Sequence, residues 1–232
     1  MSEVTICNLA LSHLGDTATV ASINPPEASV QAQLCSKFYP VARNALLEMN
    51  AWGFATRRAA LAQLAAPVNA CPQPWKYTYA MPNAVLNVLA ILPKDAPDDY
   101  EAWFGPSGKE HYPPYPQGYV PVPGPGIYMP QPFTIEADVN GKQIVLTNVC
   151  DAVMRYTTIV EDTTKFSPLF VVSLSWLLAS MLAGPLLKGD AGAQEATRCV
   201  EMLDLFRSQA QQSDANQRKT QVEPAVSWMR GR

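Results

Sequence analysis

The chain has 232 residues, a formal net charge of −3 at pH 7, 48% apolar residues and 16% charged residues. This apolar content is enough to build a hydrophobic core, which excludes wholesale disorder, and the length allows one large domain or two small ones. The acidic balance argues against a globally basic nucleic-acid-binding protein. The charged fraction is below the usual value of about 25%, which indicates that a partner covers part of the surface.

Histidine and cysteine are too sparse and too scattered for most metal sites. The two histidines, His13 and His111, lie far apart in the sequence, and the five cysteines include no CxxC pair. Zinc sites built on several histidines are therefore excluded, and the cysteines are predicted to be small buried residues in a reducing compartment. The N-terminus lacks the basic region of a signal peptide, so we expect synthesis in the cytoplasm. His13 is expected to be a surface residue at the end of a helix.

Two amphipathic helices are predicted at the start of the chain. Residues 2–14 carry apolar side chains every three or four positions, with a capping serine at Ser2 and a stop at Gly15. Residues 28–51 form the second helix, and Pro40 is expected to bend it. The predicted buried stripe of this second helix consists of Val30, Leu34, Phe38, Ala42, Ala45 and Met49, with Leu46 beside it.

The pattern changes to β-strands after residue 62. Alternating or continuously apolar segments of strand length occupy residues 75–80, 85–92, 133–139, 142–148 and 152–160. The pair Asn140-Gly141 between two of them predicts a hairpin with a two-residue type I′ turn. The middle of the chain, residues 63–160, is therefore predicted to be a small antiparallel β-module.

A proline-rich arm over residues 93–132 interrupts this β-module. The arm contains eleven of the 21 prolines, which excludes a helix or a central strand. A plain linker would not carry so many aromatic rings, so we expect these rings to dock on a surface of the same chain or of a neighbour. The candidate interaction residues of the arm are Trp103, Phe104, Tyr112, Tyr115, Tyr119 and Tyr128.

Helices return near the C-terminus. Ser167-Pro168 is a typical helix start, and residues 169–187 then carry no charge. This length allows a transmembrane span, but dispersed serines, the break expected at Gly184-Pro185 and the absence of flanking basic clusters favour a central helix buried on all sides. A last helix is predicted over residues 191–212, with an apolar face of Ala193, Ala196, Val200, Leu203, Phe206 and Ala210.

The chain is expected to end in an extended polar tail over residues 213–232. Its candidate interaction residues are Arg218, Lys219, Trp228 and Arg230. The predicted fold class is α+β, with a helical bundle formed by residues 1–62 and 161–212. The β-module 63–160, with its arm 93–132, is inserted between the two parts of this bundle.

No sequence motif of an enzyme is present. The GxSxG, GxxxxGK[ST] and GxGxxG patterns are all absent. The alternative that stays open is a small cytosolic hydrolase with a carboxylate pair, either Asp95–Glu101 or Glu161–Asp162. The preferred interpretation is a non-enzymatic protein without a cofactor that acts through its surfaces.

Several segments carry a family resemblance. Residues 8–16 read NLALSHLGD, and residues 42–59 contain ARNALL followed by WGFATRRA. Residues 75–82 read WKYTYAMP. The set is completed by Arg155-Tyr156, by FSPLF at residues 166–170 and by AGPL at residues 183–186. Together they resemble the head-to-tail adaptor family of short-tailed bacteriophages, also called tail tubular protein A or gatekeeper.

The resemblance implies a structural role in the virion. A member of this family forms a ring, usually dodecameric, beneath the portal protein at the unique vertex of the capsid. The tail nozzle, and in some cases tail fibre proteins, assemble onto the ring, and genomic DNA passes through its lumen without sequence-specific binding. The family has no catalytic residue, so the resemblance transfers none to this chain.

Overall fold

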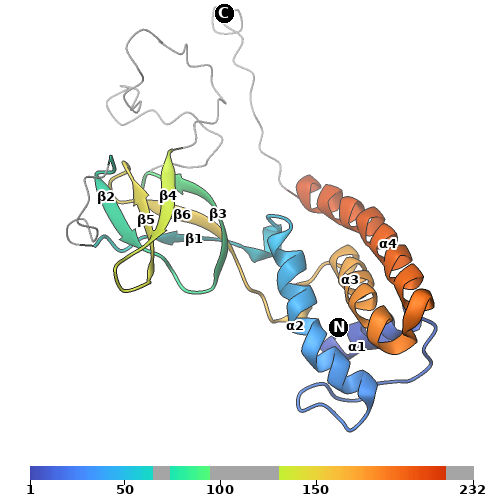
Figure 1. Ribbon diagram of the computed structural model, residues 1–232. Helices are drawn as coiled ribbons and strands as arrows, with labels where there is room; N and C mark the ends of the chain where they lie inside the picture. The colour runs from blue at the N-terminus through green and yellow to red at the C-terminus, as the bar shows by residue number, and fades with distance from the viewer. Residues whose placement is uncertain (65–73, 95–130, 218–232) are drawn as a thin grey trace, which may run out of the picture. The chain divides into compact units, whose positions relative to one another are not determined.

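The computed structural model describes residues 1–64, 74–94 and 131–217 (Figure 1). The fold is α+β, as predicted, with helices from both ends of the chain and small antiparallel sheets from its middle. The chain divides into two compact units. The helical unit contains Met1–Thr56 and the described part of Thr157–Arg218, and the β-unit contains the described part of Arg57–Tyr156. The observed boundaries, at 56/57 and 156/157, fall a few residues before the predicted boundaries at 62/63 and 160/161.

Helix α1 (Glu3–His13) begins and ends as its sequence predicts. The side chain of Ser2 accepts a hydrogen bond from the Thr5 amide at 3.1 Å, which satisfies one of the free amides of the first turn. At the other end Gly15 has a φ of +75°, and the Gly15 amide donates to the Ser12 carbonyl. The next amide donates back to Leu11, which completes a Schellman motif, and glycine adopts this left-handed conformation at the least cost.

Helix α2 (Val30–Glu48) begins at Ser29, whose side chain accepts from the Ala32 amide, and it is continuous through Pro40. Its predicted buried stripe is wrong, because only Ala42 and the adjacent Leu46 of that set are buried. The true inner face consists of Ala32, Cys35, Tyr39, Ala42, Arg43, Leu46 and Leu47. The two stripes have the same helical spacing, so periodicity alone did not distinguish the face that packs from the face that is exposed.

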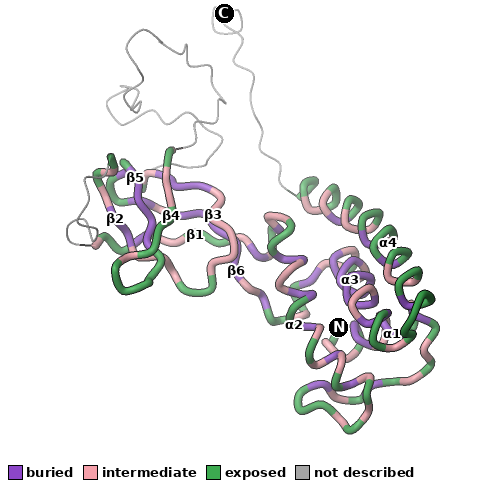
Figure 2. The backbone as a smooth tube through the Cα atoms, viewed as in Figure 1, coloured by how far each residue is buried: buried purple, intermediate pink, exposed green. Residues whose placement is uncertain are grey.

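Helix α3 (Pro168–Leu187) is the central helix of the helical unit. Ser167 caps it as predicted, and most of its length is buried against α1, α2 and α4 (Gly189–Asn216) (Figure 2). The predicted break at Gly184-Pro185 is wrong, since α3 continues to Leu187. Pro185 lies in the last turn and removes one amide donor there without ending α3, and the helix ends at Lys188, whose φ of 54° and ψ of 163° are not helical.

Helix α4 differs from the prediction on one face and at its C-terminal end. Leu203 and Ala210 are buried as predicted, but Ala193 and Val200 are exposed. Gly192 is buried instead, and a Cβ there would lie only 3.0 Å from the Ala183 carbonyl oxygen, so glycine favours this close approach of α3 and α4. Residues 213–216, predicted as the start of the extended tail, are helical.

The β-unit contains two three-stranded sheets among the described residues. The first has the order β1 (Thr56–Ala60), β6 (Val153–Thr158), β3 (Val85–Leu92), and the second has the order β2 (Tyr77–Ala80), β5 (Gln143–Thr147), β4 (Phe133–Ala137). Residues 56–60 are a correction to the sequence analysis, which placed them in the helical domain. Their sequence, TRRAA, has no alternation of apolar and polar residues, so only pairing within the sheet makes them a strand.

The hairpin between β4 and β5 is confirmed, but its turn is not type I′. Ala137 pairs with Gln143, the Asp138 amide donates to Lys142, and the Gly141 amide donates to Asp138. Three residues therefore form the loop, and of these only Gly141 has a positive φ, at +76°. This geometry is typical of a three-residue hairpin with a bulge, in which glycine occupies the left-handed position.

One hydrophobic core fills the β-unit. The buried side chains come from both sheets and from the loops between them: Leu61, Tyr79, Ile91, Val145, Val149, Ala152, Met154 and Tyr156. The segment after β1 also pairs with β2, because the Leu64 amide donates to Thr78 and the Ala80 amide donates to Ala62, both at 2.9 Å. The two sheets are thus joined along this segment, and β3 and β4 are the outermost strands of the described arrangement.

Candidate interaction surfaces

All of the interaction residues predicted from the sequence lie outside the described residues. They are Trp103, Phe104, Tyr112, Tyr115, Tyr119 and Tyr128 of the proline-rich arm, and Arg218, Lys219, Trp228 and Arg230 of the tail. His111 and the carboxylate pair Asp95–Glu101 lie outside them as well. These assignments therefore stay predictions, and the sites below are built from described side chains.

A polar cluster joins α1, α3 and α4 at His13. The His13 ring stacks on Trp176 with 3.6 Å between centroids and 7° between planes, and its Nε2 lies 3.0 Å from the Ser175 hydroxyl. Arg198 donates to the His13 carbonyl at 2.9 Å and lies over the same Trp176 ring. Arg198 also forms an ion pair with Glu195. His13 is therefore partly buried and makes structural contacts, which corrects the expectation of a surface histidine.

The positive charge of Arg198 disfavours protonation of His13 in this cluster. Burial lowers the pKa of His13 from its ordinary value of 6.5, and the nearby Arg198 guanidinium lowers this pKa further. The Ser175 hydroxyl donates to the Val172 carbonyl at 2.8 Å, so His13 Nε2 donates to Ser175. A neutral His13 protonated on Nε2 satisfies all of these contacts, and this cluster holds the three helices in register.

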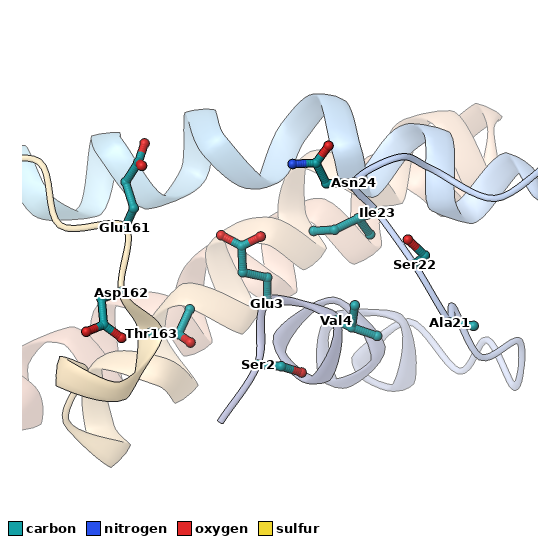
Figure 3. Close-up of a pocket in the computed structure, with 10 residues that line it drawn as sticks. All are labelled: Ser2, Glu3, Val4, Ala21, Ser22, Ile23, Asn24, Glu161, Asp162 and Thr163. Atoms are coloured by element: carbon teal, nitrogen blue, oxygen red, sulfur yellow. The ribbon is translucent and has the colours of Figure 1, made fainter.

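An open acidic pocket of about 410 Å³ lies between the start of α1, the loop at residues 21–24 and the segment 161–163 (Figure 3). Arg43 approaches it from α2 and pairs with two acids, at 3.9 Å from Glu3 and at 3.4 Å from Glu161. The Arg43 side chain is 8% exposed, so this guanidinium is buried with its charge compensated. Arg43 therefore links α2 to the start of α1 and to the segment 161–163 beside the pocket.

The carboxylates of Glu161 and Asp162 serve different contacts. Glu161 pairs with Arg43, whereas Asp162 accepts hydrogen bonds from the amide and hydroxyl of Thr164 at the start of a short 3-10 helix, Thr163–Lys165. The hydrogen bonds from Thr164 lower the pKa of Asp162. The two side chains point in different directions in Figure 3. The two carboxylates therefore bind different partners and do not face a common site. The described residues contain no cluster of potential metal ligands.

The four cysteines in the described part of the chain occupy two environments, and Cys71 lies outside it. Cys7, Cys35 and Cys199 are buried as predicted, but Cys150 is exposed, which corrects the expectation for that residue. A hydrogen bond with Cys35, together with burial, raises the pKa of the Cys7 thiol. Cys7 thus stays protonated at neutral pH and contributes to the contact between α1 and α2 as a small apolar side chain.

Helix α2 presents an outer face, defined here as Val30, Leu34, Lys37, Val41 and Glu48. Val30 and Val41 are among the most exposed large apolar side chains of the helical unit, at 62% and 55%. Lys37 lies 5.4 Å from the Phe38 ring centroid. An amphipathic helix normally exposes a polar face, so an apolar outer face on α2 indicates a binding surface.

Helix α4 presents an outer face of a different character. It is defined here as Asp190, Thr197, Glu201, Asp204, Leu205 and Ser208, all of them exposed (Figure 2). Leu205 is 49% exposed and lies next to Asp204 and about one helical turn after Glu201. Asp204 pairs with Arg207 at 2.9 Å. This face is acidic with one large apolar side chain at its centre.

The segments that carry the family resemblance contribute to packing. The side-chain amide of Asn8 donates to the Val20 carbonyl and accepts from the Val20 amide, which fixes the loop after α1. The Trp52 indole donates to the Leu46 carbonyl at 2.8 Å. In the β-unit the Tyr79 hydroxyl donates to the Val149 carbonyl at 2.9 Å. These residues hold loops and helix ends in place.

Trp52 also belongs to an aromatic cluster with Phe54, Phe166 and Phe170. The ring centroids of Trp52 and Phe170 lie 5.1 Å apart, as do those of Phe54 and Phe170. Phe166 lies 5.7 Å from Phe54 and 4.8 Å from Phe170. Two segments that are distant in the sequence therefore meet in one cluster, and this contact ties the end of α2 to the start of α3.

No protein-family model and no curated protein matches this sequence. By length and composition, one helix of the described chain, α3, is able to cross a membrane, but most of its apolar window is buried inside the protein. The class that the fold defines is an α+β protein with a helical unit and a β-unit.

Sequence reasoning missed both outer faces and the His13 cluster. Val30 and Leu34 of the α2 outer face were predicted to be buried, because their spacing is that of any amphipathic helix. The His13 cluster had no sequence signal, since its members come from three helices. One signal could have identified the α2 outer face: Val30 and Val41 lie on the side of α2 opposite Tyr39 and Leu46.

Proposed function

We propose that this chain is a structural head-to-tail adaptor of a tailed bacteriophage. Copies of the chain form a ring beneath the portal protein, the tail nozzle or tail fibres assemble onto that ring, and genomic DNA passes through its lumen. The chain acts in the virion after synthesis in the host cytoplasm. It performs no catalysis and needs no cofactor in this role.

One observation carries the proposal: two of the resemblance segments, distant in the sequence, meet in space. The WGFATRRA segment supplies Trp52 and Phe54, and the FSPLF segment supplies Phe166 and Phe170. The four rings form a single aromatic cluster that joins the end of α2 to the start of α3. This convergence supports reading them as one architectural signature.

The exposed faces of the helical unit support the same proposal. A protein that acts by assembly needs surfaces that its own fold leaves uncovered. The outer faces of α2 and α4 supply two such surfaces of different composition. The low charge content of the chain agrees with a surface that partners cover.

The direct test is binding to portal rings. The purified chain, mixed with the portal protein of the same phage and examined by electron microscopy, is expected to add a ring-shaped layer to one end of the portal. A chain that leaves portal rings unchanged at micromolar concentration contradicts the proposal.

A truncated chain tests the tail separately. A stop codon after Gln217 keeps all of α4, including Asp214, whose carboxylate accepts from the Gly53 amide at 2.9 Å. We expect the truncated chain to keep its circular dichroism spectrum and to bind portal rings at least about 10-fold more weakly. Unchanged affinity would show that residues 218–232 make no portal contact.

A further inference from the structure

We propose that neighbouring copies of the chain contact each other through the outer face of α2 on one copy and the outer face of α4 on the next. This inference rests on the proposed ring and names the contact that builds it. The occupant of the α2 outer face is thus a second copy of this chain.

The first argument is the composition of the two faces. The α2 outer face is apolar at Val30, Leu34 and Val41, and its exposed cation is Lys37. The α4 outer face has Leu205 beside Glu201 and Asp204, and the two neighbouring cations of α4, Arg198 and Arg207, are already paired with Glu195 and Asp204. Apolar side chains on both faces give an anhydrous centre, and charges of opposite sign give the contact its register.

The second argument is that the decisive charges are available. Lys37 and Glu201 have no ionic partner among the described residues, in contrast to Asp204, which already pairs with Arg207. An ion pair between Lys37 of one copy and Glu201 of the next would use both charges without breaking an existing contact. Glu48, the one anion of the α2 outer face, already takes part in an interaction within its own chain. Charge complementarity therefore favours contact between the two different faces over contact of the α2 face with itself, in which Lys37 would meet no available carboxylate.

The third argument is the position of the two helices. Both α2 and α4 pack against α3, which lies between them in the helical unit (Figure 1). Their outer faces are turned away from α3, so one copy offers two different surfaces on different sides. A closed ring requires this arrangement, because each copy must contact two neighbours through unlike patches.

The test uses two variants that each damage one face. Val41→Asp places a charge on the α2 outer face, and Leu205→Asp does the same on the α4 outer face; both positions are about half exposed, so the fold tolerates the change. Val139→Asp, at a position that is 76% exposed in the β4–β5 turn, is the matched control. Sedimentation equilibrium measures self-association, and circular dichroism checks the fold of each variant.

We expect the unmodified chain and Val139→Asp to self-associate equally, and each face variant to associate at least about 30-fold more weakly. An equimolar mixture of Val41→Asp and Leu205→Asp is expected to form a one-to-one dimer that grows no further, because it retains one intact pair of faces. If Leu205→Asp associates like the unmodified chain, if the mixture stays monomeric, or if the unmodified chain is monomeric at all concentrations, the contact is wrong.

A charge exchange provides a second measurement. Lys37→Glu is expected to weaken association, and Lys37→Glu with Glu201→Lys in the same chain to restore it, since the pair re-forms with reversed sign. If the double variant associates as weakly as Lys37→Glu alone, the assigned pairing of Lys37 with Glu201 is wrong. Portal binding separates this inference from the proposed function: portal rings that acquire a full ring of Val41→Asp overturn the contact and leave the adaptor role standing. A chain that self-associates as described but never binds portal rings overturns the adaptor role alone.

Discussion

Two buried tyrosines show how differently the same hydroxyl group can contribute to stability. Tyr39 of α2 is 1% exposed, and its hydroxyl has no hydrogen-bond partner among the described residues. Burial raises the pKa of Tyr39 above its ordinary value. Tyr79 of β2 is also buried, but its hydroxyl donates to Val149 and accepts from the Ala152 amide. A buried polar group is costly unless it is paired, so the two hydroxyls have opposite effects.

Replacing each tyrosine by phenylalanine is expected to give opposite results. Tyr39→Phe should leave the unfolding free energy unchanged or raise it by up to about 1 kcal/mol, because no hydrogen bond is lost. Tyr79→Phe should lower it by about 1–3 kcal/mol, because the Val149 carbonyl and the Ala152 amide lose their partner. Hydrogen exchange read separately in the two units measures both effects. A Tyr39→Phe variant destabilised as much as Tyr79→Phe would mean that the Tyr39 hydroxyl is paired in solution.

The His13 cluster predicts a specific dependence of stability on pH. The pKa of His13 in the folded chain lies below its ordinary value of 6.5. Above that pH the imidazole is neutral in both states and the cluster has its full stability. As the pH falls below 6.5 the unfolded chain takes up a proton that the folded chain resists, so stability falls until the folded pKa is passed. The charged group that lowers this pKa is Arg198 of α4, which is itself paired with Glu195.

The His13→Gln variant isolates this contribution. Glutamine retains a donor for Ser175 but does not titrate, so the variant should lose less stability than the unmodified chain between pH 7 and pH 5. Urea unfolding at several pH values in this range measures the difference. Glu195 does not interfere, because its contact with Arg198 lowers a pKa whose ordinary value is already 4.5. Parallel pH curves for the two chains would contradict the assignment.

At the scale of the helices, glycine acts in three distinct ways. Gly15 ends α1 with a φ of +75°, Gly184 lies inside α3, and Gly192 allows α4 to approach α3. An added Cβ at Gly15 or Gly184 meets nothing within 4 Å, so packing does not decide the effect there. Backbone conformation decides it instead.

Alanine substitutions at these glycines should therefore differ in sign. Gly184→Ala should raise the unfolding free energy by about 0.5–1 kcal/mol, because alanine is the better helix former. Gly15→Ala should lower it by about 1–2 kcal/mol, because a left-handed conformation is costly for alanine. Thermal unfolding followed by circular dichroism measures both changes. Equal effects at the two positions would mean that the Schellman turn does not persist in solution.

At the scale of the whole chain, the two compact units predict that the β-unit is a separate folding unit. Its core is made entirely of residues between Leu61 and Tyr156, and its sheets pair with each other along residues 62–64. A fragment of about 100 residues buries enough surface to fold alone. The helical unit is different, because α3 and α4 must return from the far end of the sequence to cover α1 and α2.

The fragment Arg57–Tyr156 should therefore fold without the helices. We expect a β-type circular dichroism spectrum, a cooperative unfolding transition and slow amide exchange in β5, which is hydrogen-bonded on both sides. The fragment from Met1 to Thr56 is the comparison and should be unfolded, since it lacks α3. Rapid exchange throughout β5 would show that the β-unit depends on the helices.

The sequence by itself determined the type and order of most elements. Ser2, Ser167 and Gly15 predict helix ends through local hydrogen bonds and backbone conformation, and these depend on few neighbours. The hairpin at Asn140-Gly141 is predicted for the same reason, although its turn contains three residues. Such signals are local, so they survive without knowledge of the rest of the chain.

Only the tertiary structure decided which face of each helix is buried. Periodicity gave α2 an apolar stripe through Val30 and Leu34, whereas packing against α3 buries the face through Cys35 and Tyr39. The strand β1 and the cluster of His13, Trp176 and Arg198 likewise depend on partners far away in the sequence. Burial depends on which other segments pack against a residue, and the local sequence does not identify those segments.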